Sequence, residues 1–317
     1  MSITNSTVVE SARFWIGRVV PPIFIIIGLI GNALAMLILS QSHYRRNTTC
    51  LYMRVTSIVD TAYLIGRCLQ RYLFTMIPAI LSSPQIKKPL CLEYFFVYTT
   101  ADDISCVLLL AMTVERSLVL AFPFKSKQLS TMRRAWVTII TIVLIVVLLS
   151  AFNFIRSRHD KYRVWTCPYH FHNGFDVVYD TVHAIIPTGV AFLLIALNAF
   201  IIVTVTRSSK ADVGKQVQAA ESTSSASHIT RSLVVLTTSY CLFRFPLTLY
   251  KIMYSMQSYK AGSGLTDSEH SLIFDVTVYC RYGYFVFNSY MYILSCAKFR
   301  KELGIFFAGG RYLVCLR

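Results

Sequence analysis

The sequence alternates between long apolar runs and short polar segments in which Arg and Lys recur. A helix that crosses a bilayer needs about 20 predominantly apolar residues, and each of these runs is long enough to supply them. The pattern predicts an all-α membrane protein, built as a seven-transmembrane helix bundle. The predicted helices cover residues 15–40, 50–76, 91–121, 133–154, 177–206, 230–256 and 272–294.

The polar segments predict how this bundle lies in the membrane. Residues 1–14 precede the first run and residues 295–317 follow the last, so an odd number of crossings puts the two ends on opposite sides. Arg and Lys collect after the first, third and fifth runs and in the C-terminal segment, which the positive-inside rule assigns to the cytoplasm. We therefore expect a multi-pass plasma-membrane protein with an extracellular N-terminus and a transmembrane domain over residues 15–294.

Two polar stretches have a predicted structure of their own. The segment CAKFRKELGIFF alternates basic and apolar groups at helical spacing, which predicts a short amphipathic eighth helix on the inner membrane surface, followed by a short cytoplasmic tail. Residues 207–231 are rich in Ser and Lys and lack aromatic residues. They predict a flexible cytoplasmic loop, with candidate phosphorylation sites from Ser222 to Ser227.

The composition excludes several classes of protein. Hydrophobic residues make up 55% of the 317 residues, far more than a soluble protein of this length carries. A net charge of +16 would suggest nucleic acid as a partner, but much of the excess lies between apolar runs, where it faces anionic lipid. The nine cysteines form no CxxC pair. For the polar segment with His159, His170 and His172, a solvated loop is favoured over a zinc site.

Beyond the candidate phosphorylation sites, four side chains are candidates for covalent modification. Asn5 begins a glycosylation sequon on the expected outer side, whereas the sequon at Asn47 lies on the expected inner side and should stay unmodified. Cys91 and Cys167 lie in polar segments of the outer side, where an oxidising environment permits a disulfide between them. Cys315 is a candidate palmitoylation site, with an unmodified cysteine as the alternative.

Charged residues inside the apolar runs are the main sign of function. A charge in the hydrocarbon region is costly, so such residues either pair across the bundle or serve a function. Asp60 is one such residue: either it has a function, or it forms a salt bridge that only joins helices. Arg67 follows Asp60 by two turns and lies on the same helical face. Arg71 is expected near the outer boundary, extending toward water. Three arginines and three aspartates are predicted to pair with one another in the interior: Arg67, Arg244 and Arg281 with Asp102, Asp103 and Asp275, in pairs that the hydropathy pattern does not specify.

The order of several motifs resembles that of the rhodopsin-like (class A) G-protein-coupled receptors. Each motif is weak alone, but together they extend from Gly31 to Lys301. The matching residues are Gly31-Asn32, Asp60, Cys91, Glu115-Arg116-Ser117 (the DRY motif), Trp136, Cys167, Pro187, Pro246, Asn288-Ser289-Tyr290-Met291-Tyr292 (the NPxxY motif) and Phe299-Arg300.

The resemblance implies a receptor, and not an enzyme, that binds an extracellular ligand and activates a heterotrimeric G protein. It further implies a disulfide between Cys91 and Cys167, contact with arrestin and a receptor kinase, and no cofactor apart from a candidate sodium ion at Asp60. In the resting state Arg116 is expected to bond Glu115. The residues implied in coupling and activation are Glu115, Arg116, Pro246, Asn288 and Tyr292. Those of the internal sodium and water site are Asn32, Asp60, Ser105 and Asn288. The ligand-pocket candidates are Tyr98, Asp102, Arg244, Lys251, Arg281 and Tyr282.

Departures from the family pattern affect both activation and ligand class. Ser117 and Ser289 replace the tyrosine of DRY and the proline of NPxxY, and Arg244 replaces the sixth-helix tryptophan. We hypothesise that an Arg244–Asp102 bridge replaces that tryptophan as a switch; a static bridge is the alternative.

Two residues that bind ligand in other members of the family are absent here, which disfavours amines and retinal as ligands. Tyr98 stands where amine receptors have aspartate, and Tyr282 stands where opsins have the retinal lysine. Phrases such as MTVERSLVLAFPFKSKQLST most resemble invertebrate neuropeptide receptors of the FMRFamide and myosuppressin kind, which implies a peptide ligand.

Other functions fit the sequence less well. A transporter would show internal repeats and paired Gly or Pro breaks, and an intramembrane enzyme would show a motif such as HExxH or GxSxG. The sequence shows no internal self-similarity and neither of these motifs. A seven-helix receptor that binds its ligand without signalling is the stronger alternative, because Ser117, Arg244 and Ser289 all fall in activation motifs.

Overall fold

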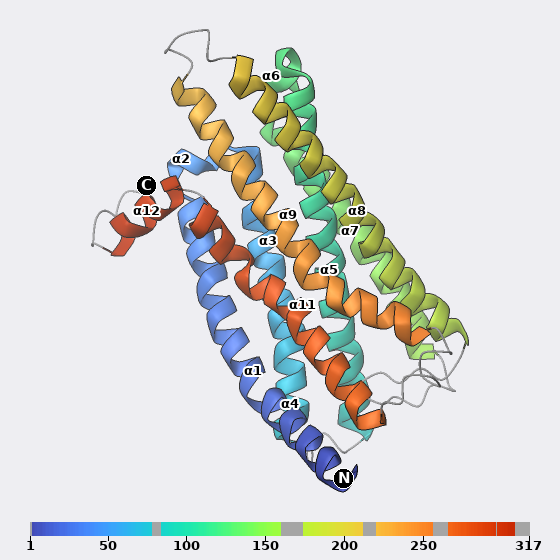
Figure 1. Ribbon diagram of the computed structural model, residues 1–317. Coiled ribbons are helices and arrows are strands. Elements are labelled where there is room, and N and C mark those ends of the chain that lie inside the picture. The colour runs from blue at the N-terminus through green and yellow to red at the C-terminus, as the bar shows by residue number, and fades with distance from the viewer. Residues whose placement is uncertain are drawn as a thin grey trace.

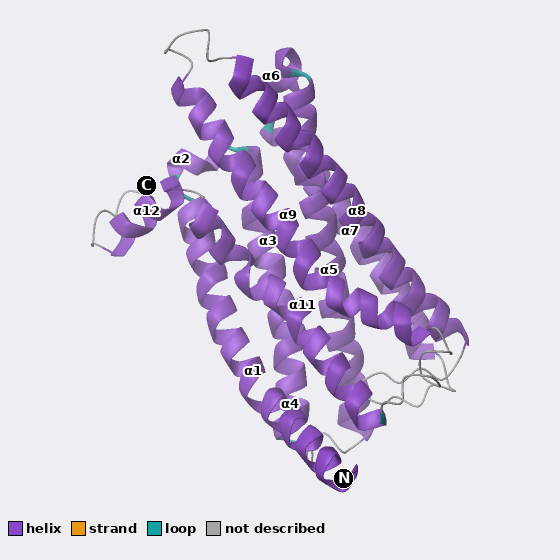
Figure 2. Cartoon of the chain, viewed as in Figure 1, coloured by secondary structure: helices purple, strands orange, loops and turns teal. Residues whose placement is uncertain are grey.

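The computed structural model describes residues 2–77, 84–159, 174–211, 220–255, 266–295 and 297–307. Within these residues the chain is helical apart from short turns, and it contains no strand (Figure 2). The all-α prediction is therefore confirmed for the part of the chain that the structure describes.

Seven long helical rods make up the described bundle. The second rod is composite: α3 (Thr48–Tyr63) continues through a π-helical turn, η1 (Leu64–Leu69), into α4 (Gln70–Met76). The other rods are α1 (Ser2–Leu39), α5 (Pro84–Ala121), α7 (Met132–His159), α8 (Gly174–Ala211), α9 (Ala220–Ser255) and α11 (Asp267–Ser295). The short elements are α2 (Ser42–Arg45), η3 (Pro123–Lys125), α6 (Ser126–Leu129) and α12 (Ala297–Phe307).

Successive rods run alongside one another in alternating directions (Figure 1). The N-terminus lies at one end of the bundle, here called the N-terminal end, and α2, α6 and α12 lie at the other, here called the α12 end. Helix α11 contacts α1 and α9, while α5 contacts α3, α7 and α8. Helix α1 also contacts α3, and α8 contacts α9, so neighbouring rods pack on one another all the way around the bundle.

Several helices are longer than the hydrophobic pattern predicts. Helix α1 begins at Ser2, and α5 begins at Pro84. The prediction of a flexible loop over residues 207–231 is wrong in part, because α8 continues to Ala211 and α9 begins at Ala220. The sequence of residues 220–231 contains neither Pro nor Gly, so nothing in it stops a helix that packing has already nucleated further along.

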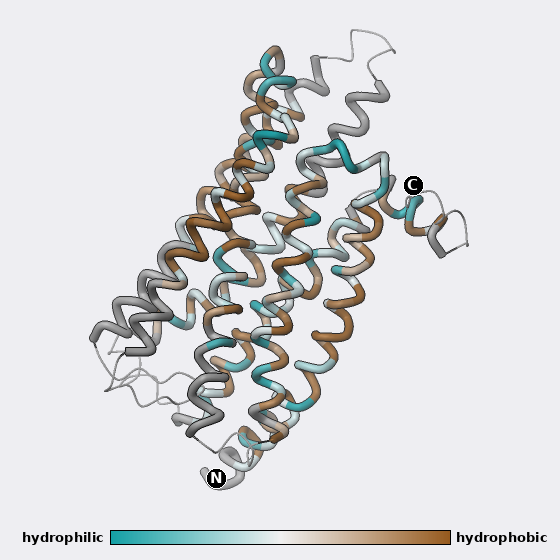
Figure 3. The backbone as a smooth tube through the Cα atoms, turned by 180° about the vertical axis from the view of Figure 1, so that it is seen from behind, coloured by the Kyte–Doolittle hydropathy of each residue, from teal (hydrophilic) through white to brown (hydrophobic). Residues whose placement is uncertain are grey.

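The outer surface of the bundle is apolar, as a lipid-facing surface must be. Large exposed hydrophobic side chains recur along α1, α7 and α8, where the hydropathy colouring shows long apolar stretches (Figure 3). Five described segments are long and apolar enough to cross a membrane: residues 7–39, 96–121, 132–151, 187–206 and 233–253. The second and seventh rods fall short of that hydropathy because they carry the polar and charged residues of the interior. The chain is a multi-pass membrane protein.

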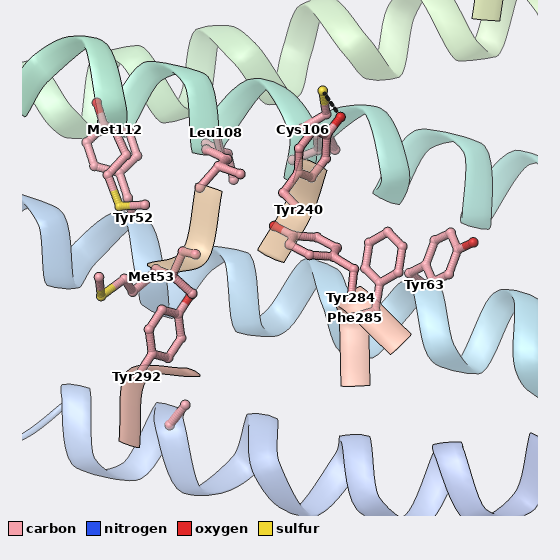
Figure 4. Close-up of a cluster of buried hydrophobic side chains, with 14 of the residues drawn as sticks. Tyr52, Met53, Tyr63, Cys106, Leu108, Met112, Tyr240, Tyr284, Phe285 and Tyr292 are labelled. Atoms are coloured by element: carbon pink, nitrogen blue, oxygen red, sulfur yellow. Dashed lines mark hydrogen bonds between the residues drawn. The ribbon is translucent and has the colours of Figure 1, made fainter. Parts of the chain in front are cut away.

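Aromatic side chains fill the middle of the bundle. Tyr63 of α3 stacks on Phe285 of α11 with ring centroids 3.6 Å apart, and Tyr240 of α9 meets Tyr284 edge-on at 5.2 Å (Figure 4). The Tyr240 hydroxyl also lies 2.9 Å from the Cys106 sulfur of α5. This layer joins α3, α5, α9 and α11, and it fixes the helix faces that carry the polar groups above and below it.

Two helix starts are capped by side chains. The Asn47 side chain accepts a hydrogen bond from the backbone N–H of Thr49 at 2.9 Å and so caps α3. Before α11, Thr266 and Glu269 form a reciprocal capping box, in which the Thr266 N–H donates to the Glu269 carboxylate at 2.8 Å. That backbone hydrogen bond lowers the pKa of Glu269 below its usual value.

Candidate functional site

A buried ion pair joins α5 to α9 in the middle of the bundle. Two Arg244 nitrogens, Nη1 and Nη2, donate to the two oxygens of Asp102, Oδ1 and Oδ2, each at 2.7 Å. Both side chains are more than nine-tenths buried. A planar guanidinium and a carboxylate in this bidentate arrangement form one of the strongest and most directional of protein hydrogen-bonded pairs. The contact expected from the sequence is present.

Asp102 also accepts a hydrogen bond from a second arginine. Arg281 of α11 donates from Nη2 to the same carboxylate, so one anion is shared by two guanidiniums. Asp103, which is partly exposed, lies within electrostatic reach of both Arg244 and Arg281. The prediction that charges pair across the interior is correct for Arg244 and Arg281, and the structure adds that they share one partner.

A second ionic cluster lies nearer the N-terminal end. Asp275 of α11 pairs with Arg71 of α4 and with Arg13 of α1, the latter at 3.3 Å. Arg71 also donates from Nε to the Tyr279 hydroxyl at 3.1 Å. The expectation that Arg71 extends toward water is wrong, because its guanidinium is held in the bundle by a carboxylate on a facing helix.

Arg67 differs from the other interior arginines. Its Nη1 donates to the neutral Gln70 side chain at 3.2 Å, and its guanidinium carbon lies 4.5 Å from the centre of the Tyr98 ring. No aspartate or glutamate pairs with it among the residues that the structure describes. The expected pairing is therefore not found. The expectation that it shares a face with Asp60 assumed an uninterrupted α-helix, and the π-helical turn η1 changes the register exactly where Arg67 lies.

Asp60 occupies a fully buried polar site between α3, α5 and α11. Its carboxylate accepts hydrogen bonds from Ser105 Oγ at 2.9 Å and from Asn288 Nδ2 at 2.6 Å. Asn32 does not join it as predicted, because the Asn32 carbonyl instead accepts a hydrogen bond from Ser289. Ser289 stands where the family pattern has proline, and its hydroxyl supplies this different partner.

The residues around Asp60 fit a hard cation. The Asn288 carbonyl oxygen is buried and has no hydrogen-bond partner, although the amide nitrogen of the same side chain does. Carboxylate, hydroxyl and amide oxygens are the donors that hard cations prefer. Asp60, Ser105 and Asn288 together offer all three kinds.

At the α12 end, a network of hydrogen bonds joins α5 to the start of α3. Arg116 donates to Thr49 Oγ1 and, at 3.1 Å, to Asn47 Oδ1. The neighbouring Glu115 accepts instead from Thr48 and from Ser130, the latter at 2.9 Å. The predicted bond between Arg116 and Glu115 is thus replaced by bonds from each residue to a different polar partner.

These partners were not identified from the sequence. Asn47, Thr48 and Thr49 were read only as a sequon on the inner side, although an asparagine followed by two threonines also marks a helix start. Phe124 was also missed: its side chain is fully exposed on η3, beside Lys125 and directly before α6. A bulky aromatic residue in a basic turn was the available signal.

The remaining predicted site residues are placed as follows. Tyr282 and Tyr292 are buried in α11, Pro246 lies within α9, and Lys251 is partly buried one turn further along α9. The side chains of Asn5 and Cys91, and all of Cys167 and Cys315, lie outside the described residues. The predicted disulfide, glycosylation and palmitoylation therefore remain predictions.

Comparison with protein families adds independent information. Residues 31–297 match the family described as 7 transmembrane receptor (rhodopsin family), and this range takes in the Asp102, Asp60 and Arg116 clusters. A search of the curated proteins gives no match. Because the matched range covers most of the chain and coincides with a bundle of seven helical rods, the chain belongs to the rhodopsin family of seven-transmembrane receptors.

Proposed function

We propose that the chain is a plasma-membrane receptor that binds an extracellular peptide in the N-terminal half of the bundle and activates a heterotrimeric G protein at the α12 end. The observation that carries the proposal is the buried Asp102–Arg244 pair. It connects α5 to α9 at the position where the family pattern has its sixth-helix tryptophan. A ligand that changes this pair acts directly on α9.

The distribution of charge supports an orientation with the α12 end in the cytoplasm. Cationic residues gather on the short elements of that end, α2, η3, α6 and α12, and at the start of α7. Short connections rich in Arg and Lys are typical of the cytoplasmic side. The residues are Arg45, Arg46, Lys125, Lys127, Arg133, Arg134, Arg300 and Lys301.

The proposed signal is a movement of α9 relative to α5. Pro246 lies two residues after Arg244, and a proline inside a helix removes one backbone hydrogen bond and provides a hinge. A ligand that alters the Asp102–Arg244 pair therefore acts at the hinge itself. Signalling requires that ligand and G protein each favour the same one of two bundle states. Arg116, released from Thr49 and Asn47, is the group proposed to face the G protein. Arrestin and a receptor kinase are the further partners that this function entails.

The Asp60 cluster is proposed as an internal cation site. Asp60, Ser105 and Asn288 would hold a sodium ion through their oxygen atoms. A bound ion would supply the positive charge that the buried carboxylate lacks, because its observed partners Ser105 and Asn288 are neutral. Asp60, Ser105 and Asn288 come from α3, α5 and α11, so holding that charge would link the three helices.

A peptide screen with a matched coupling variant tests the proposal. Cells that express the receptor are exposed to a neuropeptide library and read with a G-protein dissociation sensor. We expect at least one peptide to give a signal that Arg116→Ala abolishes at equal surface expression. A receptor that binds a peptide at its surface but gives no dissociation would instead support the non-signalling alternative, for which Ser117 and Ser289 are the relevant departures.

A further inference from the structure

We propose that the ligand is recognised through an oxyanion, a carboxylate or phosphate group, which binds between Arg67 of η1 and the Arg281–Tyr282 segment of α11. This inference rests on the proposed function, because it names the chemistry of the ligand for that receptor. It is carried by the charge balance of the ionic clusters on the N-terminal side of Asp60, by the neutral hydrogen-bond partner of Arg67 and by two buried donors without acceptors.

On the N-terminal side of Asp60, the arginines of the two ionic clusters and Arg67 outnumber the carboxylates. Each carboxylate that forms ion pairs is shared: Asp102 by Arg244 and Arg281, and Asp275 by Arg71 and Arg13. Asp103 adds one negative charge beside the Asp102 cluster, and Arg67 adds one further positive charge. Unbalanced charge is costly in a low-dielectric interior. An anion that enters this region reduces the excess, whereas a cation increases it.

Arg67 is the arginine best suited to receive that anion. The other three interior arginines are already bonded to carboxylates, but Arg67 has a neutral amide at Gln70 and the face of the Tyr98 ring. A guanidinium presents five N–H donors in a fixed fork that matches an oxyanion. Its place is also fixed by packing: a Cβ on the preceding residue, Gly66, would lie 3.0 Å from Val97, so η1 is held tightly against α5.

Two further donors in the same region have no acceptor. The Tyr282 hydroxyl and the Arg281 Nε are buried, and neither the O–H nor the N–H proton has an acceptor; the neighbour of the Tyr282 oxygen is itself a donor, the Arg67 guanidinium. The Arg67 guanidinium lies beside the Tyr282 side chain. The positive charges of Arg71 and Arg281 are also close enough to act on Tyr282. Buried donors without acceptors are rare and costly. An oxyanion has several lone pairs that accept hydrogen bonds and it carries negative charge. One such group would therefore bond the free donors and also balance the local positive charge.

Aromatic rings near Arg67 indicate what chemical group lies next to the anion in the ligand. Tyr63, Tyr98, Tyr279 and Tyr282 form a continuous set of edge-to-face contacts, with centroid distances between 5.5 and 6.4 Å. Such rings favour an apolar or aromatic body next to the charged group. An aromatic acid, such as a C-terminal aromatic residue with a free carboxylate, combines the two features.

The test uses a carboxylate and its neutral isostere as probes. The full-length receptor is purified in an uncharged detergent, and its thermal unfolding is followed with increasing N-acetylphenylalanine or N-acetylphenylalaninamide. A ligand that binds the folded state raises Tm with concentration. We expect the acid, and not the amide, to raise Tm. In Arg67→Gln the apparent Kd for the acid should weaken about tenfold or more, as the loss of hydrogen bonds to a charged group implies.

Two variants guard against a false result. Arg18→Gln removes an exposed arginine of α1 and should respond as the wild type does. Tyr282→Phe removes a hydroxyl that has no acceptor and lies beside the Arg67 guanidinium, so the ligand-free Tm should change little while the response to the acid weakens. Equal effects of acid and amide, or a full acid response in both Arg67→Gln and Tyr282→Phe, would overturn the proposal.

Measurements in different lipids distinguish two sources of the anion, a lipid headgroup and a soluble ligand. In nanodiscs of phosphatidylcholine the acid response should persist. If added phosphatidylserine raises Tm in the wild type but not in Arg67→Gln, and removes the acid response, the site takes a lipid headgroup. If the acid response is unchanged, it takes a soluble ligand. Neither readout involves a G protein. A bound acid without any G-protein dissociation would contradict the proposed function alone, whereas peptides of equal potency on Arg67→Gln would contradict this inference alone.

Discussion

At the scale of single residues, Asp102 is the most constrained position in the bundle, because one carboxylate balances two guanidiniums on different helices. Removing one partner of a buried ion pair leaves the other charge uncompensated. We therefore expect Asp102→Asn to lower the free energy of unfolding by about 3–5 kcal/mol. Thermal and denaturant unfolding of the purified receptor would measure the loss.

The adjacent aspartate provides the matched control. Asp103→Asn makes the same chemical change one residue along α5, at a partly exposed side chain, and should cost clearly less. If the two variants lose the same stability, the shared ion pair does not hold α5 to α9 and α11 in the way described.

The sequence predicted which residues would need partners more successfully than it predicted the partners. Charges in apolar runs have to be balanced, so the involvement of Arg244, Arg281 and Asp102 followed from hydropathy alone. The pairing of Arg71 and the neutral surroundings of Arg67 did not follow. They depend on the helical register past η1, and no proline or glycine pair in the sequence marks that π-helical turn.

At the scale of helices, close approach at particular glycines decides how tightly the rods pack. A Cβ at Gly66 would lie 3.0 Å from the Val97 side chain and 3.4 Å from the backbone N of Tyr98, whereas a Cβ at Gly189 of α8 meets nothing within 4 Å. Alanine is favoured over glycine inside a helix by about 0.5–1 kcal/mol. We expect Gly189→Ala to raise Tm and Gly66→Ala to lower it, since α5 would have to move.

Unfolding of both alanine variants alongside the wild type checks this pair of predictions. Because the substitution is the same, differences in helix propensity cancel, and the sign of the difference reports the contact with α5. Two increases in Tm of similar size would show that η1 is not held closely against α5.

The number and type of the helices followed from the sequence, but their ends did not. An apolar run long enough to cross a bilayer leaves little alternative to a helix, because backbone groups in lipid must bond within the segment. Beyond the hydrocarbon region that constraint disappears. Helix α9 then continues through the Ser-rich residues 220–231, whose polarity alone had predicted a loop.

At the scale of the whole molecule, the two ends of the bundle are joined through α5. It carries Asp102 in the ion-pair layer, Ser105 beside Asp60, and Arg116 at the α12 end. The family motifs located Arg116 in advance, the resemblance implied Ser105 as part of the site at Asp60, and hydropathy singled out Asp102. The replacement of the expected Arg116–Glu115 bond by bonds to the start of α3 was not foreseeable, since it depends on how α3 is capped next to α5.

The bonds between Arg116 and the start of α3 lead to a prediction about basal signalling. Arg116 is bonded to Thr49 and Asn47, so a state in which it turns toward a G protein must give up both bonds. Thr49→Ala removes one of them and leaves the cap on the Thr49 N–H in place. A hydrogen bond to a charged group contributes about 1.5–3 kcal/mol, which corresponds to about tenfold or more in the equilibrium between two states.

Thr49→Ala should therefore raise ligand-independent G-protein dissociation by about tenfold or more, because only the state with Arg116 bonded to α3 is weakened. Thr61→Ala makes the same change on the same helix, where the hydroxyl bonds only to the Ser57 carbonyl of its own helix, and should leave basal signalling unchanged. Both are compared with the wild type at equal surface expression. Equal basal signals from the two variants would mean that the bond to Thr49 does not restrain Arg116, and that the restraint on this end of the bundle lies with Glu115 and its partners Thr48 and Ser130.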